Sequence, residues 1–162
     1  MPSPLLRPGV QTDANDLLAL HRRSILQLGP SGYTKAECES WASGLTATGY
    51  IDAMTGGGET YLVAEVSGNV AGFCSYKANE VIGLYVDPKE ARRGVGSMLL
   101  CEAEAAIVRC SETSIKLSAA LTAKKFYQSH HYEVRFERLW KTRGGLEILV
   151  CGMEKCIVQP LK

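Results

Sequence analysis

The sequence predicts a mixed α/β fold of one domain, residues 1–162, with a mostly antiparallel central sheet flanked by helices. Its 162 residues, 46% of them hydrophobic, can bury a sizeable core. Hairpin patterns lie near the middle and at the end of the chain, and an amphipathic helix pattern lies between them. The sequence contains no internal repeat, low-complexity run or linker that would divide it further.

The N-terminal part is expected to form a short edge strand and two helices. Residues 5–8 (LLRP) suit the strand. Asp13 or Asn15 can cap the first helix, which ends at residues 28–32 (LGPSG). Residues 34–37 (TKAE) form a capping-box pattern, which predicts the start of the second helix.

The middle of the chain is expected to form a hairpin, a third strand and a long helix. Residues 60–66 and 70–76 are rich in β-forming residues and are separated by Ser-Gly-Asn, which predicts the hairpin. Residues 81–86 predict the third strand. The pattern over residues 95–110 predicts a helix with one small or apolar face, formed by Val95, Leu99, Ala103, Ala106 and Cys110.

The C-terminal part is expected to complete the sheet. Residues 114–118 predict a short strand and residues 121–129 a short helix. Two further strands, over residues 132–141 and 147–155, flank the turn sequence Arg-Gly-Gly at residues 143–145, which predicts a second hairpin.

Composition limits the classes of partner. Acidic and basic residues nearly balance, with a net charge of +1 and a pI of about 7.6. This balance predicts no nucleic-acid partner and no anionic membrane partner. The apolar runs are too short to span a bilayer, and the first residues lack the basic and apolar regions of a secretory signal. We therefore expect a cytoplasmic protein.

The cysteines fit the same expectation. Six occur, and four of them lie within apolar strand or helix patterns, where cysteine acts as a small hydrophobic residue. No Cys-x-x-Cys pair occurs and the three histidines lack ligand spacing, so no metal site is expected. Reduced cysteines are typical of the cytoplasm.

The clearest chemical signal lies in residues 81–100 (VIGLYVDPKEARRGVGSMLL). A strand pattern is followed by a basic, glycine-containing turn and at once by a helix. This order places free backbone N–H groups of a helix N-terminus just beyond a strand end, where phosphate binds, and glycines allow close approach. The turn consists of Arg92, Arg93, Gly94, Val95, Gly96 and Ser97. An ordinary turn with its arginines in solvent is the alternative interpretation.

Together with residues 117–127 (LSAALTAKKFY), this segment resembles the GNAT superfamily of acyl-CoA-dependent N-acetyltransferases. The superfamily signature, Gln/Arg-x-x-Gly-x-Gly/Ala between a strand and a helix, falls on residues 91–96, with Ala91 in place of the usual Gln or Arg. The resemblance extends over residues 6–155 and implies the GNAT fold, whose order of elements it matches.

The resemblance implies that the chain transfers an acetyl group from acetyl-CoA, its cosubstrate, to a primary amine. The pyrophosphate of coenzyme A would bind the turn, and main-chain groups of Leu84, Tyr85 and Val86 would hold the pantetheine arm and the thioester carbonyl. The acceptor would be an amine-bearing small molecule or peptide, whose identity the sequence leaves open. Since many relatives pair through their C-terminal strands, a homodimer is an open alternative to a monomer.

Two side chains are candidates for catalysis on the same resemblance. Tyr127 falls at the position of the superfamily's general acid, which protonates the departing thiolate. A core tyrosine with a hydrogen-bonded hydroxyl is the alternative. Glu80, at the start of the third strand, matches the glutamate base of the histone-acetyltransferase branch. An exposed carboxylate at a strand end is an equally compatible interpretation.

Several further positions depart from the superfamily pattern or lie in its variable half. His130 and His131 stand where a glycine commonly precedes an aromatic residue, here Tyr132, and a histidine at a helix end can also simply cap it. Ala120 replaces a residue that is often polar. The aromatic residues of the variable N-terminal half, where the acceptor pocket is built, are candidates for lining it or for the core: Tyr33, Trp41 and Tyr50.

Two rival functions follow from the same residues. A non-catalytic acyl-CoA-binding module of the same fold stays open because of Ala91 and the two interpretations of Glu80. A nucleotide-binding protein of another class is disfavoured, because the turn lacks both the Walker Gly-Lys-Ser/Thr and the Gly-x-Gly-x-x-Gly of dinucleotide sites.

Overall fold

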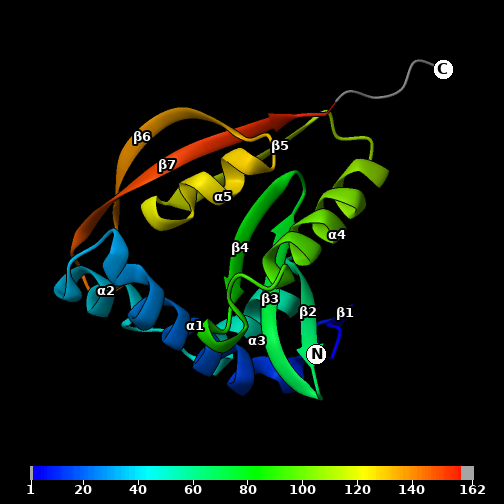
Figure 1. Cartoon of the computed structure of the whole chain (residues 1–162), viewed down its shortest axis with the longest axis horizontal. Coiled ribbons are helices and arrows are strands. Elements are labelled where there is room, and N and C mark those ends of the chain that lie inside the picture. The colour runs from blue at the N-terminus through cyan, green and yellow to red at the C-terminus, as the bar shows by residue number, and fades with distance from the viewer. Residues whose placement is uncertain (1, 158–162) are drawn as a thin grey trace.

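The computed structural model describes residues 2–157, which build one seven-stranded sheet with helices on both faces (Figure 1). The spatial order of the strands is β1-β2-β3-β4-β5-β7-β6. They are β1 (Leu5–Pro8), β2 (Thr60–Val66), β3 (Asn69–Lys77), β4 (Glu80–Val86), β5 (Ser114–Ala120), β6 (Glu133–Lys141) and β7 (Glu147–Cys156). The α-helices are α1 (Ala14–Leu28), α2 (Lys35–Ala42), α3 (Ala47–Thr55), α4 (Val95–Arg109) and α5 (Lys124–Ser129).

Neighbouring strands of the described sheet are antiparallel except β4 and β5, which are parallel. Parallel neighbours need a long crossover, and α4 supplies it. The expected mixed, mostly antiparallel sheet flanked by helices is therefore confirmed. Each strand predicted from the sequence is found within two residues of its expected limits.

Side chains along each strand point alternately to the two faces of the sheet. Each face packs against helices and forms its own core. In β2, Val63 packs in the core beneath α1 and α3, whereas Ala64 packs in the core beneath α4. Phe73 and Cys74 of β3 divide in the same way. The helices α1, α2 and α3 thus form one layer, and α4 and α5 the other (Figure 1).

Two features of the N-terminal layer differ from the prediction. The helix α3 has no strong sequence signal, because it contains a glycine and threonines, which are poor helix formers. Thr46 caps it by accepting a hydrogen bond from the Gly49 N–H at 3.2 Å. Asp13 does not cap α1 with its side chain. Its carboxylate instead accepts from the Arg7 guanidinium and the Val10 N–H, each at 2.8 Å.

The burial of the cysteines and the buried face of α4 also differ in part from the prediction. Cys110 is exposed at the end of α4. The residues of α4 that are buried are Val95, Leu99, Leu100, Ala103 and Ile107. All six cysteines lie within residues 2–157 and are free, and three of them are buried: Cys38, Cys74 and Cys151.

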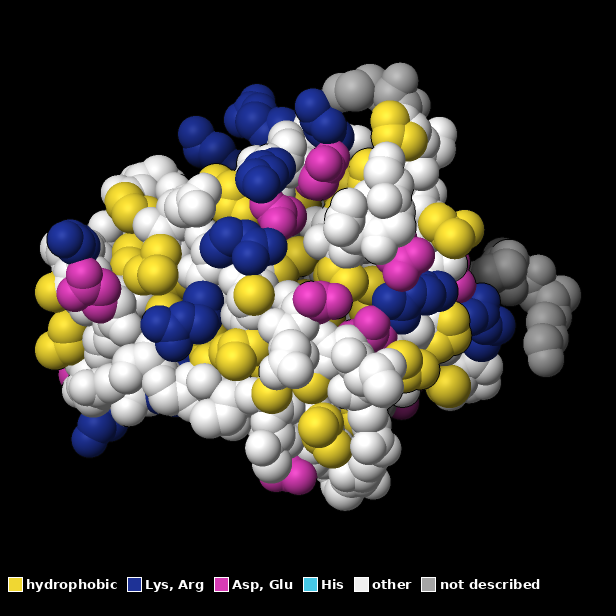
Figure 2. All heavy atoms as spheres, turned by 90° about the horizontal axis from the view of Figure 1, so that it is seen from below, with side chains coloured by type: hydrophobic (Ala, Val, Ile, Leu, Met, Phe, Trp, Pro, Cys, Tyr) yellow, Lys and Arg dark blue, Asp and Glu magenta, His cyan; other side chains and the backbone are white. Residues whose placement is uncertain are grey.

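The surface carries charges of both signs. Figure 2 shows Lys and Arg side chains interspersed with Asp and Glu on the face that it displays. Among residues 2–157, no helix combines the length and the apolar character needed to cross a bilayer. In the same part of the chain, His, Cys, Asp and Glu side chains do not gather in a group of three or more that could hold a metal ion.

Candidate functional site

The two halves of the sheet separate between β4 and β5. In the described sheet these strands pair at their beginnings, Glu80 with Lys116 and Val81 with Leu117, and not beyond. A register shift between β3 and β4 leaves Ile82 as an extra residue where the separation starts. We call the opening between residues 82–86 and residues 118–120 the fork. Along the fork, the edge of β4 that faces β5 has no strand partner in residues 2–157.

The closed end of the fork is fixed by Asn79, just ahead of β4. Its side-chain amide donates to the Ser114 carbonyl oxygen at 3.2 Å. The Lys116 N–H donates to the Asn79 carbonyl oxygen at 3.0 Å. These bonds anchor the beginnings of β4 and β5 to each other, so the fork opens towards the C-terminal end of β4, where the basic turn begins.

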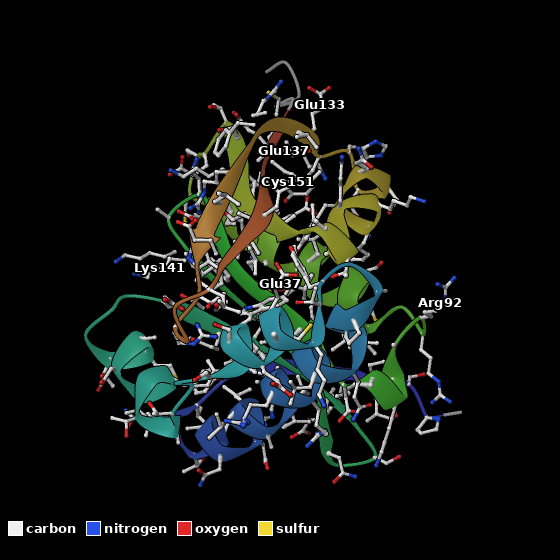
Figure 3. The ribbon with its side chains drawn as sticks, turned by 90° about the vertical axis from the view of Figure 1, so that its left-hand side faces the viewer. Glu37, Arg92, Glu133, Glu137, Lys141 and Cys151 are labelled. Carbon is white, nitrogen blue, oxygen red and sulfur yellow. The ribbon has the colours of Figure 1, made fainter. Side chains whose placement is uncertain are left out.

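The basic turn, residues 92–97, presents free backbone N–H groups. Arg92 and Gly94 have left-handed φ values of 63° and 85°, which fold the chain back into α4. The Met98 N–H donates to the Gly94 carbonyl oxygen, so the N–H groups of residues 95–97 precede the first helical hydrogen bond. These N–H groups lie at the positive end of the helix dipole, which favours binding of an anion. Figure 3 shows the Arg92 side chain at the outer edge of the molecule.

The helix α5 lies directly beside this turn. A Cβ at Gly96 would lie 3.5 Å from the Phe126 ring and 3.5 Å from a Val86 methyl, so it would be in ordinary contact with both. The Ser97 Oγ lies 2.9 Å from the His130 Nε2 at the end of α5. The turn, the end of β4 and α5 therefore share one wall at the open end of the fork.

Tyr127 of α5 is buried in the core on the α4 side, the core that also contains Leu84 and Val86. Its ring contacts Phe126 and Tyr132 edge-on, with centroids 5.1 and 5.7 Å away. Burial raises the pKa of Tyr127 well above its usual value. The hydroxyl is therefore protonated at neutral pH and can donate a hydrogen bond or a proton.

The opposite side of β4 is aromatic. Tyr85 points towards α1 and α2, where its ring lies 3.8 Å from that of His21, 5.6 Å from Phe73 and 6.4 Å from Trp41, measured between centroids. Burial raises the pKa of Tyr85 to about 12. Of the three fork residues expected to use their main chain, Tyr85 thus faces the helix layer that lies away from Tyr127.

Tyr33 links the helix layer to the second half of the sheet. Its hydroxyl donates to the Leu149 carbonyl oxygen of β7 at 2.7 Å and accepts from the Leu121 N–H at 2.9 Å. Leu121 directly follows β5. The backbone at the open end of β5 is therefore satisfied by a buried side chain from the α1–α2 connection, which holds that arm of the fork in place.

A second link joins α1 to the end of β4. The Arg23 guanidinium donates to the Asp87 carboxylate at 2.7 Å, and the Lys89 N–H donates to the same carboxylate at 3.0 Å. These contacts lower the pKa of Asp87 in spite of its burial. A hollow of about 550 Å³ lies beside this pair, lined also by Arg93 and by the β2–β3 turn. Asp87 therefore fixes the path of the chain into the basic turn.

Glu80 lies apart from these groups. It is at the closed end of the fork, in register with Lys77 of β3 and Lys116 of β5. Leu84, which shares the core with Tyr127, is four residues further along β4, about 13 Å at the usual rise per residue. The structure thus brings the basic turn, the end of β4 and Tyr127 together, and leaves Glu80 at a distance.

Comparisons with known proteins identify relatives of the whole fold. Residues 57–134 match the model of the acetyltransferase (GNAT) domain. An uncharacterised N-acetyltransferase of Escherichia coli, YafP, is 24% identical over 133 residues, which cover 82% of this chain and 83% of YafP. The structure of a GCN5-related N-acetyltransferase from Rhodopseudomonas palustris matches with a TM-score of 0.90 and 26% identity, over 97% of this chain and 98% of that one. These matches together indicate a GNAT superfamily N-acetyltransferase.

A more distant solved structure, the acetyltransferase YncA of Salmonella typhimurium with its cofactor acetyl-CoA, shows the same fold. It matches this GNAT chain with a TM-score of 0.72 and 16% identity, and covers 99% of this chain and 97% of its own. The residues that match the GNAT model contain the fork-forming strand β4, the basic turn and Tyr127.

The backbone at His131 fits the expectation that a glycine often stands at this position. Its φ of 71° is left-handed, a conformation that favours glycine. The sequence analysis missed the ring contact between His21 and Tyr85, the ion pair between Arg23 and Asp87 and the hydrogen bond between Ser97 and His130. No local pattern signals such contacts, because each joins segments far apart in the chain.

Proposed function

We propose that this N-acetyltransferase moves an acetyl group from acetyl-CoA to a primary amine by direct attack, with Tyr127 as general acid and Glu80 as base. The observation that carries the proposal is the position of the fork, whose open end lies beside the free N–H groups of the basic turn and beside Tyr127. The acetyl-CoA in the Salmonella relative supports the choice of donor.

The donor would be held by the main chain. The edge of β4 facing the fork, at Leu84, Tyr85 and Val86, offers amide and carbonyl groups to the extended pantetheine arm, as an additional strand would use them. The basic turn, from Arg92 and Arg93 through Gly94, Val95 and Gly96 to Ser97, would bind the pyrophosphate. Both contacts fix the thioester near Tyr127, which is the main catalytic effect of such a site.

The chemical step forms one bond and breaks one. The amine nitrogen attacks the thioester carbonyl carbon, and the resulting tetrahedral intermediate loses its C–S bond electrons to sulfur. The Tyr127 hydroxyl donates its proton to that sulfur and later regains one from solvent. Although burial makes Tyr127 a weak acid, the same burial destabilises a thiolate, so its proton affinity rises as well.

The proton of the attacking amine would pass to Glu80. Since Glu80 lies at the closed end of the fork, about 13 Å from the level of Leu84 along β4, the transfer requires intervening water.

The remaining features of the proposal concern partners and location. The acceptor would be an amine-bearing small molecule or peptide, since the mixed surface charge favours neither nucleic acid nor an anionic membrane. Six free cysteines favour a reducing compartment such as the cytoplasm. The proposal includes a homodimer, and light scattering would measure the oligomeric state.

The test is release of free thiol from acetyl-CoA in the presence of a panel of amines, followed with a thiol-reactive dye. We expect release to depend on both the protein and an amine. Binding of acetyl-CoA without any amine-dependent release would instead support the non-catalytic acyl-CoA-binding module. A melting temperature raised by ATP or NAD but not by coenzyme A would overturn both interpretations.

A further inference from the structure

The contact between Ser97 and His130 joins α4 to α5 at the basic turn. Ser97 is the third residue of α4, and its N–H is one of those that precede the first helical hydrogen bond. Its Oγ lies 2.9 Å from the His130 Nε2. Both residues are half-buried, so the pair forms part of the wall of the turn and its groups remain within reach of a ligand.

His130 is held firmly enough to orient its partner. It is the C-cap of α5, and its N–H donates to the Tyr127 carbonyl oxygen at 3.0 Å. Its ring lies against Phe126, with centroids 4.8 Å apart. Since Phe126 also borders Gly96, the imidazole is positioned by the same side chain that borders the turn.

The direction of the hydrogen bond decides what Ser97 offers to an anion. If the His130 Nε2 lacks a proton, the Ser97 hydroxyl donates to it and turns oxygen lone pairs towards the turn. If Nε2 carries the proton, it donates to the Ser97 Oγ, and the hydroxyl hydrogen is free to point at an anion. An anion bound at the helix N-terminus therefore selects the second arrangement.

We propose that His130 is a positioning residue for acetyl-CoA, which donates from Nε2 to Ser97 so that the Ser97 hydroxyl donates to a pyrophosphate oxygen. The inference rests on the proposed function and deepens it. It adds a side-chain donor to the main-chain N–H groups of the turn, and it gives α5, the helix of Tyr127, a direct link to the bound phosphate. The neutral Nε2–H tautomer is sufficient, so no charge on His130 is required.

The experiment measures the dissociation constants of coenzyme A and of pantetheine, which lacks the phosphates, by calorimetry. We expect His130→Ala to weaken coenzyme A binding about tenfold, the usual effect of one hydrogen bond to a charged group, and to leave pantetheine binding unchanged. Ser97→Ala should have a similar effect, and adding His130→Ala to it should cost little more, because the two act through one bond. His130→Gln, which keeps an N–H donor, should recover part of the affinity.

His131→Gly is the matched control, since this exposed neighbour has a left-handed φ that glycine adopts freely, and it should bind coenzyme A as the wild type does. Circular dichroism would confirm that each variant is folded. If His130→Ala does not fold, the comparison between His130→Gln and the wild type provides the test. Equal losses for coenzyme A and pantetheine, or independent effects of the two alanines, would show a structural role only. A wild-type protein that does not bind coenzyme A would overturn the proposed function itself.

Discussion

The imidazole of His21 lies against the ring of Tyr85, with centroids 3.8 Å apart, and so joins α1 to the strand that forms one arm of the fork. The His21 Nδ1 is 2.8 Å from the Tyr50 hydroxyl, while Nε2 is buried without a partner among the described residues. Burial, with a smaller contribution from Arg143, lowers the pKa of His21 to about 3. The histidine is therefore neutral and acts as part of the aromatic floor beneath β4.

This burial predicts a loss of stability in acid. The unfolded chain protonates His21 near pH 6.5, whereas the folded protein does so only near pH 3, so between these values the unfolded state binds the extra proton. The free energy of unfolding should fall by about 1.4 kcal/mol per pH unit from this group as the pH decreases through that window.

The measurement compares wild type with His21→Gln in urea unfolding at pH 7 and pH 4.5. Their difference in unfolding free energy should shift by about 2–3 kcal/mol in favour of the variant at the lower pH. Asp13 and Asp87, whose pKa values are lowered, contribute equally to both proteins and cancel. Parallel stability profiles would show that His21 is not buried in this way.

Removing one oxygen atom tests the proposed general acid. Tyr127→Phe keeps the ring and its contacts with Phe126 and Tyr132, so the fold and acetyl-CoA affinity should survive. Turnover should fall roughly tenfold to thousandfold, which is the range for loss of a positioned acid. The decrease should be smaller for acyl donors whose thiols are better leaving groups. Steady-state kinetics per folded molecule gives the answer. A variant that is destabilised but keeps its rate would assign the hydroxyl to the core.

Glu80→Gln tests the base separately from the donor site. Because Glu80 lies at the closed end of the fork, away from the basic turn, affinity for coenzyme A should stay within about twofold of the wild type. Turnover should decrease, and the acidic limb of its pH profile should be lost, since a carboxylate no longer has to be ionised. Full turnover by the variant at neutral pH would mean that the amine loses its proton to another acceptor.

The space around Gly96 allows a graded test of the proposed anion site. A Cβ there lies in ordinary contact, 3.5 Å from Phe126 and Val86, so Gly96→Ala should fold and bind coenzyme A with little change. Gly96→Val adds two more methyl groups than alanine to a packed wall, which should displace α5 or narrow the turn and lower the affinity for coenzyme A at least tenfold. Titration of both variants with coenzyme A distinguishes these outcomes. Unchanged affinity in the valine variant would remove the turn from the binding site.

The sequence was informative where the signal is local. The hairpins, the helix α4 and the basic turn follow from side-chain alternation, helical spacing and the glycines at Gly94 and Gly96, and all are found in the structure. The fork is different, because it depends on which residues of β4 and β5 pair and on one extra residue, Ile82. Sequence patterns do not specify the pairing register of two strands that are separated by a whole helix.

The same reasoning explains which contacts between site residues were overlooked. Ser97 was assigned to the basic turn and His130 to a helix end, but the two are 33 residues apart, and no local pattern indicates that they meet. Asp13 satisfied the local rule for a helix cap, yet the Arg7 guanidinium in the folded protein competes for its carboxylate. Helix α3 was missed because tertiary packing of Tyr50 outweighs its weak propensity.

If acetyl-CoA binds along the gap in the sheet as proposed, the stability of the protein depends on the supply of that cosubstrate. With two register pairs between β4 and β5 in the described sheet, the amide protons along the free edge of β4 have no strand to protect them from exchange with solvent. A pantetheine arm seated there would protect them, and every molecule bound to the folded state alone would raise the free energy of unfolding by mass action. A cell rich in acetyl-CoA would thus hold a more exchange-resistant and longer-lived enzyme than a starved one.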